Sequence, residues 1–191
     1  MLGVEDDPQR ARDNRALSSF QGVTLAEGFG QNLPQNDGTM DCVIMLDFLS
    51  RVEAFDMDDC LMEACRVLKE NDGLLYVGEY DTGGSYDDLV RMFHDQSAER
   101  SWALNALRRL PQDTVASVRE IHYGLKRQFS DFDNFVASFM AVNEPGLMNE
   151  NMNSENVRAL FEQGRKGNVF EFEQARRDNL YRSGNFTPAG A

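Results

Sequence analysis

Hydrophobic and polar positions change their periodicity twice in the middle of the chain. The run Asp41-Cys42-Val43-Ile44-Met45-Leu46 is apolar without polar alternation, which is typical of a strand covered on both faces in a parallel sheet. Apolar residues then recur at helical spacing at Met57, Leu61, Met62, Cys65 and Leu68. A second apolar run covers residues 74–79. This order predicts two parallel neighbouring strands joined by a right-handed helical crossover.

The predicted central helix has start and stop signals at its two ends. Asp56 can cap its first turn, and Asp58 and Asp59 place negative charge there. The sequence Asn71-Asp72-Gly73 is a stop signal. We therefore expect the helix to run from Asp56 to Lys69.

The same reading of the pattern predicts further strands and helices on both sides. Strands are expected at Leu2–Glu5, Val23–Ala26, Val115–Phe129 and from Phe170 to Tyr181. Helices are expected after the capping residues Asp7, Ser85 (with Asp88 as a capping box), Ser130 and Ser154, and along Trp102, Ala106 and Leu110. The stripe Phe132, Phe135, Val136, Phe139 and Met140 is the clearest amphipathic pattern. We expect one domain over residues 1–182 and a frayed tail over 183–191.

The central segment also carries a recognisable motif. Glu63, Arg66-Val67-Leu68-Lys69 and Gly73 follow the pattern E-x-x-R-V-L-K-x-x-G with one additional residue between Lys69 and Gly73, and Met40-Asp41 opens the preceding strand. The segment resembles the middle of a small-molecule class I S-adenosylmethionine-dependent methyltransferase. The resemblance implies an α/β fold: a Rossmann-like, mostly parallel sheet flanked by helices, closed by an antiparallel strand pair at Val115–Phe129 and Val169–Arg182. It also implies S-adenosylmethionine as cofactor and a small-molecule methyl acceptor.

The predicted cofactor residues follow the first strands. Glu5 ends a strand, where open α/β sheets bind ligands, and a carboxylate can accept hydrogen bonds from two ribose hydroxyls. The resemblance assigns that role to Glu5, with Asp6 beside it; acids that stabilise a helix end are the alternative. Gly28-Phe29-Gly30 resembles the family's adenine loop G-D-A-x-x-L-P, although Phe29 replaces the Asp and can only pack on the base. A flexible turn is the alternative, and Leu46 completes the predicted site.

Candidates for the acceptor pocket follow the central strands. Asp47 could accept a substrate proton, and Arg51 could neutralise an anionic substrate. Tyr80, with the helix bearing Phe93 and Trp102, could wall the pocket. An exposed loop and ordinary core packing are the alternatives. No catalytic residue is assigned, because the sulfonium is already activated and positioning supplies much of the rate.

The resemblance has one large gap. The family's first strand and its Gly-rich turn, which approaches the methionine part of the cofactor, have no counterpart in this sequence. The absent strand would lie between Leu2–Glu5 and Asp41–Leu46, so two strand edges would lack a partner. We expect an oligomer or direct pairing of these two strands, in a piece of a longer enzyme or a natural short form. The alternative function is a catalytically inactive methyltransferase-like subunit that binds a protein through its open sheet.

Composition and net charge disfavour some classes of binding partner. The net charge of −13 disfavours nucleic acid and anionic membrane, which need clustered Lys and Arg. No apolar run approaches the ~20 residues of a membrane span, and no signal peptide is visible. Cys42, Cys60 and Cys65 are predicted to be buried free thiols in a reducing cytoplasm, with no metal site.

Overall fold

The chain divides into two compact units. The computed structural model describes residues 1–17, 21–142 and 150–184. Unit 1 comprises Met1–Val77, Trp102–Glu120 and Asn179–Ala191, and unit 2 comprises Gly78–Ser101 and Ile121–Asp178. Each unit is described by itself, and the single domain expected over residues 1–182 stays a prediction.

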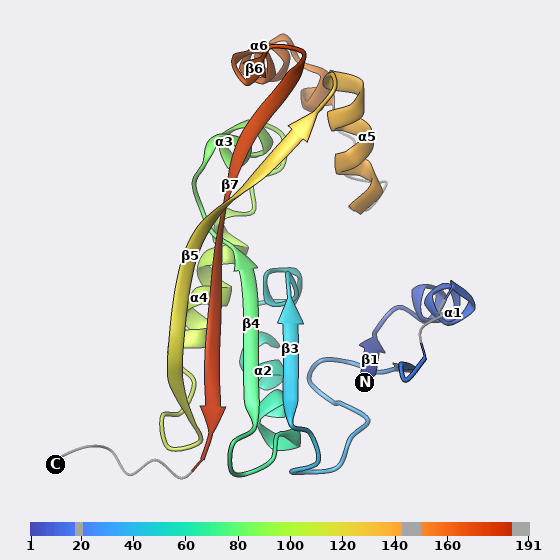
Figure 1. Ribbon diagram of the computed structural model, residues 1–191, viewed down its shortest axis with the longest axis vertical. Helices are drawn as coiled ribbons and strands as arrows, with labels where there is room; N and C mark the ends of the chain where they lie inside the picture. The colour runs from blue at the N-terminus through green and yellow to red at the C-terminus, as the bar shows by residue number, and fades with distance from the viewer. Residues whose placement is uncertain (18–20, 143–149, 185–191) are drawn as a thin grey trace, which may run out of the picture. The chain divides into compact units, whose positions relative to one another are not determined.

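A strand, a helix and a second strand form the centre of unit 1. The strand β3 (Cys42–Leu46), the helix α2 (Met57–Val67) and the strand β4 (Leu74–Tyr80) follow one another in the chain. β3 and β4 are hydrogen-bonded neighbours, and Figure 1 shows them running in the same direction. Buried side chains of α2, β3 and β4 share one hydrophobic core, which contains Met57, Leu61, Met45, Leu75 and Val77. The predicted parallel crossover is confirmed.

Two details of α2 differ from the prediction. Met62 is 44% exposed, because five residues after Met57 place it about 140° around the helix from that buried side chain. Asp56 occupies the N-cap position, but its side chain makes no capping hydrogen bond. Its backbone is already near-helical, with φ −96° and ψ −11°, whereas a side-chain cap needs an extended residue.

The antiparallel closing pair is confirmed. The long strands β5 (Val115–Phe129) and β7 (Val169–Ser183) are neighbours in the sheet order β3-β4-β7-β5, and Figure 1 draws them in opposite directions. The short strand β6 (Arg165–Lys166) pairs antiparallel with β7. Ser183 is buried at the end of β7, where its amide donates to the Gly73 carbonyl at 2.8 Å. Residues 185–191 of the predicted tail lie outside the described residues.

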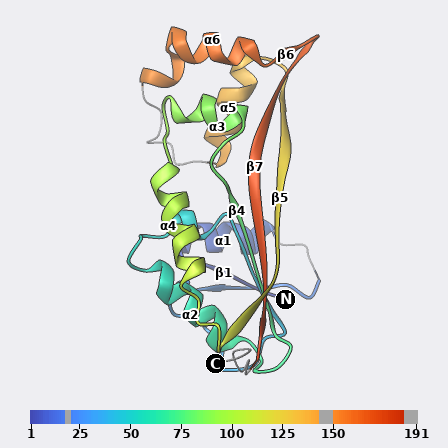
Figure 2. The ribbon, with the colours of Figure 1, turned by 90° about the vertical axis from the view of Figure 1, so that its left-hand side faces the viewer.

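Unit 2 has an aromatic core to which β5 and β7 contribute side chains. The helices α3 (Ser85–Arg91), α5 (Phe132–Val142) and α6 (Glu155–Gln163) lie on one side of these two strands, as Figure 2 shows. Phe135, Phe139 and Phe161 are buried, and the rings of Phe161 and Phe170 stack at 4.3 Å between centroids. The amphipathic stripe of α5 is therefore confirmed.

The caps of the unit 2 helices are confirmed in one case and wrong in two. Ser154 caps α6 by accepting from the Val157 amide. The residue that caps α5 is Asp131 rather than Ser130. Oδ1 of Asp131 accepts from the Asn134 amide at 2.8 Å, whereas Ser130 lies one residue earlier, directly after β5. Ser85 forms no capping box; its hydroxyl accepts from the Glu173 amide of β7 at 3.0 Å, and Gly84 is the N-cap. Part of the predicted loop after α5 lies outside the described residues, which resume with a 3-10 turn, η3 (Glu150–Asn153).

Helix α4 (Ser97–Arg108) runs from unit 2 into unit 1. Ala106 and Leu110 are buried as predicted, whereas Trp102 is 47% exposed. The side of the helix that faces the core carries the smaller Ala103, which is 1% exposed, and Trp102 lies outside that side. Trp102 is therefore not part of the core stripe that the sequence predicts.

The first two strands form a small sheet of their own. β1 (Leu2–Glu5) and β2 (Thr24–Glu27) pair in parallel, from Leu2 opposite Thr24 to Glu5 opposite Glu27, and α1 (Pro8–Leu17) connects them. Direct pairing of β1 with β3, one of the two expected closures, does not occur, because the two strands lie in separate sheets; the oligomer stays a prediction. The predicted interruption of the sheet at this position is confirmed.

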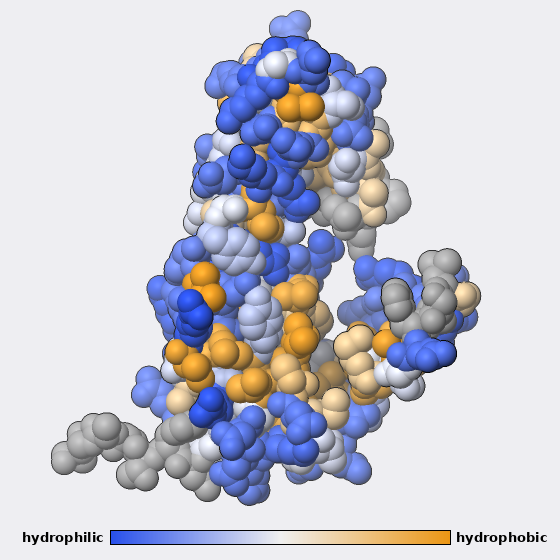
Figure 3. Space-filling view, viewed as in Figure 1, coloured by the Kyte–Doolittle hydropathy of each residue, from blue (hydrophilic) through white to orange (hydrophobic). Residues whose placement is uncertain are grey.

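One face of the β3–β4 pair carries exposed apolar side chains. β3 ends the larger sheet, and its alternate residues Ile44 and Leu46 are 60% and 54% exposed. Figure 3 shows hydrophobic side chains gathered over β3 and β4. Cys42 lies on the same strand face and is also exposed, so its predicted burial is wrong. Cys60 and Cys65 are buried, and burial raises the pKa of each thiol to about 11.

Candidate functional site

Glu5 lies at the carboxyl end of β1 with one carboxylate oxygen engaged. Its Oε1 accepts from the Asp7 amide at 3.3 Å and lies 3.6 Å from Nε of Arg10. Within the described residues no hydrogen bond is recorded to its second oxygen, Oε2. The N-cap of α1 is Asp7, whose Oδ1 accepts from the amides of Gln9 and Arg10 at 2.7 and 2.9 Å. These hydrogen bonds lower the pKa of Asp7, which is therefore the residue that caps α1.

The predicted adenine loop begins beside Glu5. The Gly28 amide donates to the Glu5 carbonyl at 3.1 Å. A Cβ on Gly28 would come within 3.1 Å of the Val4 side chain, so this close approach suits glycine. Phe29 is 57% exposed, which leaves its ring free to pack on a ligand.

Gly30 joins this loop to the segment after β3. A Cβ at Gly30 would lie 2.5 Å from the Phe48 ring and 2.9 Å from Sγ of Cys60, so a larger residue would separate the two segments. Burial is the main cause of the raised pKa of Cys60, followed by the charges of Asp56 and Asp59. The charge of Asp6 adds a smaller contribution, so Asp6 lies near that thiol. The carboxyl ends of β1, β2 and β3 therefore meet within unit 1.

The family motif clamps the same loop to α2. Arg66 donates to both carboxylate oxygens of Glu63, at 2.7 and 2.6 Å, and to the Leu33 carbonyl at 3.3 Å. Glu63 in turn accepts from the Leu33 amide at 2.8 Å. Arg66 also pairs with Asp37 at 2.5 Å. The motif was recognised in the sequence, but its role in holding the loop was not predicted, because the partners lie 29 to 33 residues away.

The clamp should make the loop sensitive to acid. The hydrogen bonds from Arg66 first, and then the Leu33 amide, lower the pKa of Glu63 below its ordinary 4.5, against the effect of burial. The stabilisation is thus complete above pH 4.5 and is lost as the pH falls through the lower folded pKa. We expect Glu63→Gln to cost about 1 kcal/mol at neutral pH and to remove this acid-sensitive part.

An NMR titration that follows the Leu33 amide signal measures this effect. Glu70→Gln, at an exposed position just after α2, is the matched control and should titrate like the parent protein. The same acid response of the Leu33 signal in parent and Glu63→Gln proteins would contradict the clamp.

Asp47 follows β3 in an unusual conformation. Its φ is +51°, in the left-handed region that costs most non-glycine residues free energy, although Asp tolerates it better than most. Such strain concentrates at functional sites. Leu46 beside it is exposed. Arg51 is also exposed and lies at the end of the 3-10 turn η1 (Leu49–Arg51). The strain at Asp47 could not be read from the sequence.

The structure brings most, but not all, predicted site residues into unit 1. Glu5, Asp6, Gly28, Phe29 and Gly30 lie at the ends of β1 and β2, and Leu46, Asp47 and Arg51 follow β3. Tyr80 belongs to unit 2, where its ring contacts arginine side chains. Phe93 is buried in the aromatic core of unit 2.

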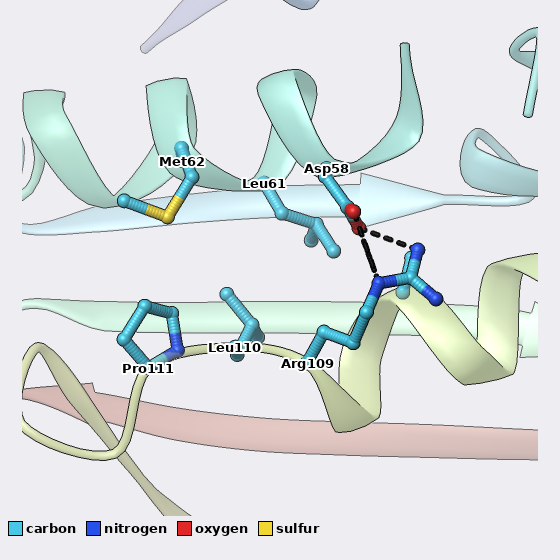
Figure 4. Close-up of a pocket in the computed structure, with 7 residues that line it drawn as sticks. Asp58, Leu61, Met62, Arg109, Leu110 and Pro111 are labelled. Atoms are coloured by element: carbon cyan, nitrogen blue, oxygen red, sulfur yellow. Dashed lines mark hydrogen bonds and ion pairs between the residues drawn. The ribbon is translucent and has the colours of Figure 1, made fainter. Parts of the chain in front are cut away.

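A small pocket lies elsewhere in unit 1, on the helical side (Figure 4). It has a volume of about 130 Å³ and lies between α2 and the end of α4. Figure 4 shows Asp58 on α2 facing Arg109, whose Nη2 donates to Asp58 at 2.7 Å across the mouth. None of the predicted site residues lines it.

Comparisons with known proteins agree with the fold. Residues 1–77 match the family model described as a methyltransferase domain. No curated protein matches the chain. Solved structures similar to it include a putative methyltransferase from Bacillus halodurans (TM-score 0.58, 16% identity, 95% of this chain and 81% of that one) and the YcgJ protein from Bacillus subtilis (0.58, 14%, 97% and 82%).

A SAM-dependent methyltransferase from Thermotoga maritima, described as a possible histamine N-methyltransferase, is also similar (TM-score 0.51, 17% identity, 95% of this chain and 72% of that one). At these identities the solved structures establish the fold alone, and the family model adds a match to a methyltransferase domain over residues 1–77. The chain therefore has the Rossmann-like fold of the class I S-adenosylmethionine-dependent methyltransferases, as its central motif predicted.

Proposed function

We propose that this chain transfers a methyl group from S-adenosylmethionine to a small-molecule acceptor. One observation carries the proposal: in a chain whose residues 1–77 match a methyltransferase domain, the carboxyl ends of β1, β2 and β3 meet at one place. In open α/β sheets ligands bind beyond the carboxyl ends of parallel strands, and the β1–β2 and β3–β4 pairs, which belong to two separate sheets, are both parallel (Figure 1). The three free cysteines favour a cytoplasmic location.

The residues present fit the adenosine part of the cofactor. Glu5 offers Oε2 to the ribose hydroxyls, with Asp6 beside it, and the exposed Phe29 ring offers a surface for the adenine. When bound, the cofactor supplies a methyl group on an activated sulfonium. We further propose that Leu46 packs beside the cofactor and that Asp47 holds an acceptor proton or cation.

Asp47→Asn tests the role of the Asp47 charge. Asn tolerates the left-handed conformation as Asp does, so we expect stability to change by less than about 0.5 kcal/mol. Methyl transfer, measured with labelled cofactor and an extract of small metabolites, should fall about tenfold or more. Asp72→Asn is the matched control, since Asp72 has φ +65° in a turn before β4, and should keep full activity. Equal activities in the two variants would contradict the role of Asp47.

A second candidate function is a methyltransferase-like subunit that acts by binding a protein. The observation that favours it is the exposed pair Ile44 and Leu46 on β3, the end strand of the larger sheet. This reading predicts a homo-oligomer in light scattering that dissociates when Ile44 is changed to Lys, because a charge cannot be buried there cheaply. Ile121→Lys, at an exposed position of β5, is the control and should leave the assembly intact. A monodisperse monomer of the parent chain would contradict self-association through β3.

A further inference from the structure

Four side chains of unit 2 form a cationic aromatic group, the Tyr80 cluster: Tyr80, Arg127, Gln174 and Arg176. Arg127 donates from Nε to Oε1 of Gln174 at 2.7 Å and from Nη2 to the Tyr80 hydroxyl at 2.8 Å. The guanidinium groups of Arg127 and Arg176 lie 5.7 and 5.1 Å from the centroid of the Tyr80 ring. Two cations thus share one ring, which cation–π attraction stabilises.

Arg127 is held by neutral groups. Its two hydrogen-bond acceptors are an amide and a phenol, and its guanidinium lies 5.6 Å from the Tyr86 ring. Across the described residues, no carboxylate forms an ion pair with it. The chain has 32 acidic and 19 basic residues, so a half-buried arginine without an acid partner is unusual in it. A guanidinium has five N–H groups; two are used, which leaves three for a ligand.

The geometry of Arg127 favours a planar anion. The second cation, Arg176, is buried and pairs with Asp178, whose carboxylate lies 3.2 Å from Nε of Arg176 and also accepts from Tyr123 at 2.8 Å. Arg127 is therefore the guanidinium with N–H groups left for a ligand. A carboxylate matches the planar fork of a guanidinium and can accept two parallel hydrogen bonds from it.

We propose that the Tyr80 cluster binds the carboxylate group of a small molecule through Arg127. Tyr80 and Gln174 then position the guanidinium, and the rings of Tyr80 and Tyr86 favour a ligand whose carboxylate is attached to an apolar or aromatic group.

Titration of the parent chain with benzoate, in the absence of S-adenosylmethionine, tests the inference. The readout is the Nε–H signal of each arginine in an NMR spectrum. We expect the Arg127 signal to shift and saturate, and Arg127→Gln to weaken benzoate binding about tenfold or more. Arg119→Gln, at an exposed position of the same strand β5, is the matched control and should bind like the parent. Tyr80→Phe keeps the ring but loses the hydroxyl, and should weaken binding by a smaller factor.

Three results would overturn the inference. These are equal shifts of the Arg119 and Arg127 signals on addition of benzoate, benzoate binding by folded Arg127→Gln as tight as that of the parent chain, and tighter binding of inorganic phosphate than of benzoate at this cluster. Because the titration contains no cofactor, a failure of benzoate binding is separate from a failure of methyl transfer, which is measured with labelled cofactor. If Arg127→Gln does not fold, Arg127→Lys and Tyr80→Phe decide: both should fold, and both should weaken benzoate binding.

Discussion

Replacing Asp87 with Ala should destabilise unit 2 by about 3–5 kcal/mol, because the substitution leaves a buried arginine without its carboxylate. Asp87 and Arg100 are 7% and 8% exposed and form an ion pair through Oδ1 and Nη1. Oδ2 of Asp87 accepts from the Gly83 amide at 3.0 Å and pairs with Arg91. After the substitution, the contact of Arg100 with the Asp81 carbonyl at 3.3 Å would be a poor replacement.

The acid dependence of this ion pair has a defined sign. Burial alone would raise the pKa of Asp87, but the Gly83 amide and the two arginines outweigh it, so the net pKa lies below the ordinary 3.8. The stabilisation is therefore present above pH 3.8 and is lost as the pH falls through the lower folded pKa. In Asp87→Ala this part of the acid dependence should disappear.

An exposed ion pair supplies the control for Asp87. Asp58 and Arg109 are 51% and 53% exposed, and Arg109 donates three hydrogen bonds to the Asp58 carboxylate. Asp58→Ala should nevertheless cost about 1 kcal/mol or less, because solvent screens the pair. Urea unfolding followed by the NMR signals of Phe135 and Phe161 reports on unit 2 for Asp87→Ala, and signals of Leu61 and Leu75 report on unit 1 for Asp58→Ala. A loss in Asp87→Ala no larger than in Asp58→Ala would contradict the importance of the buried pair.

Glu5→Gln should weaken cofactor binding about ten- to a hundredfold. Hydrogen bonds from ribose hydroxyls to a charged group are worth roughly 1.5–3 kcal/mol, and Gln removes the charge while keeping the shape of the side chain. The control lies opposite Glu5 in the parallel pair: Glu27 ends β2 and forms an ion pair with Arg15 at 2.5 Å. Glu27→Gln changes the same residue type on the neighbouring strand and should leave binding unchanged.

Sequence periodicity predicted the elements well where local pattern decides them. The apolar runs of β3 and β4 and the stripe of α5 were placed correctly, because each pattern lies within one segment. Exposure was predicted less well. The run at β3 is apolar on both faces, which shows that both suit burial but not whether another element covers them; Ile44 and Leu46 are exposed in the structure.

The candidate site was predictable in its strand-end acids and not in its supporting contacts. Glu5 and Gly28 followed from the rule for ligands at strand ends and from the family resemblance. The left-handed φ of Asp47 is a property of the folded backbone, and the Tyr80 cluster depends on strand pairing that joins residues 47 positions apart. Single-sequence patterns carry no information about either.

The most direct test of the account is an NMR titration of the chain with S-adenosylhomocysteine, which reports weak binding as well as strong. The account predicts that the amide signals of Glu5, Gly28 and Gly30 shift with a common dissociation constant. That constant should rise about ten- to a hundredfold in Glu5→Gln and stay unchanged in Glu27→Gln. Signals that shift elsewhere but not at these residues, or equal binding by Glu5→Gln and the parent chain, would contradict the placement of the cofactor at the ends of β1 and β2.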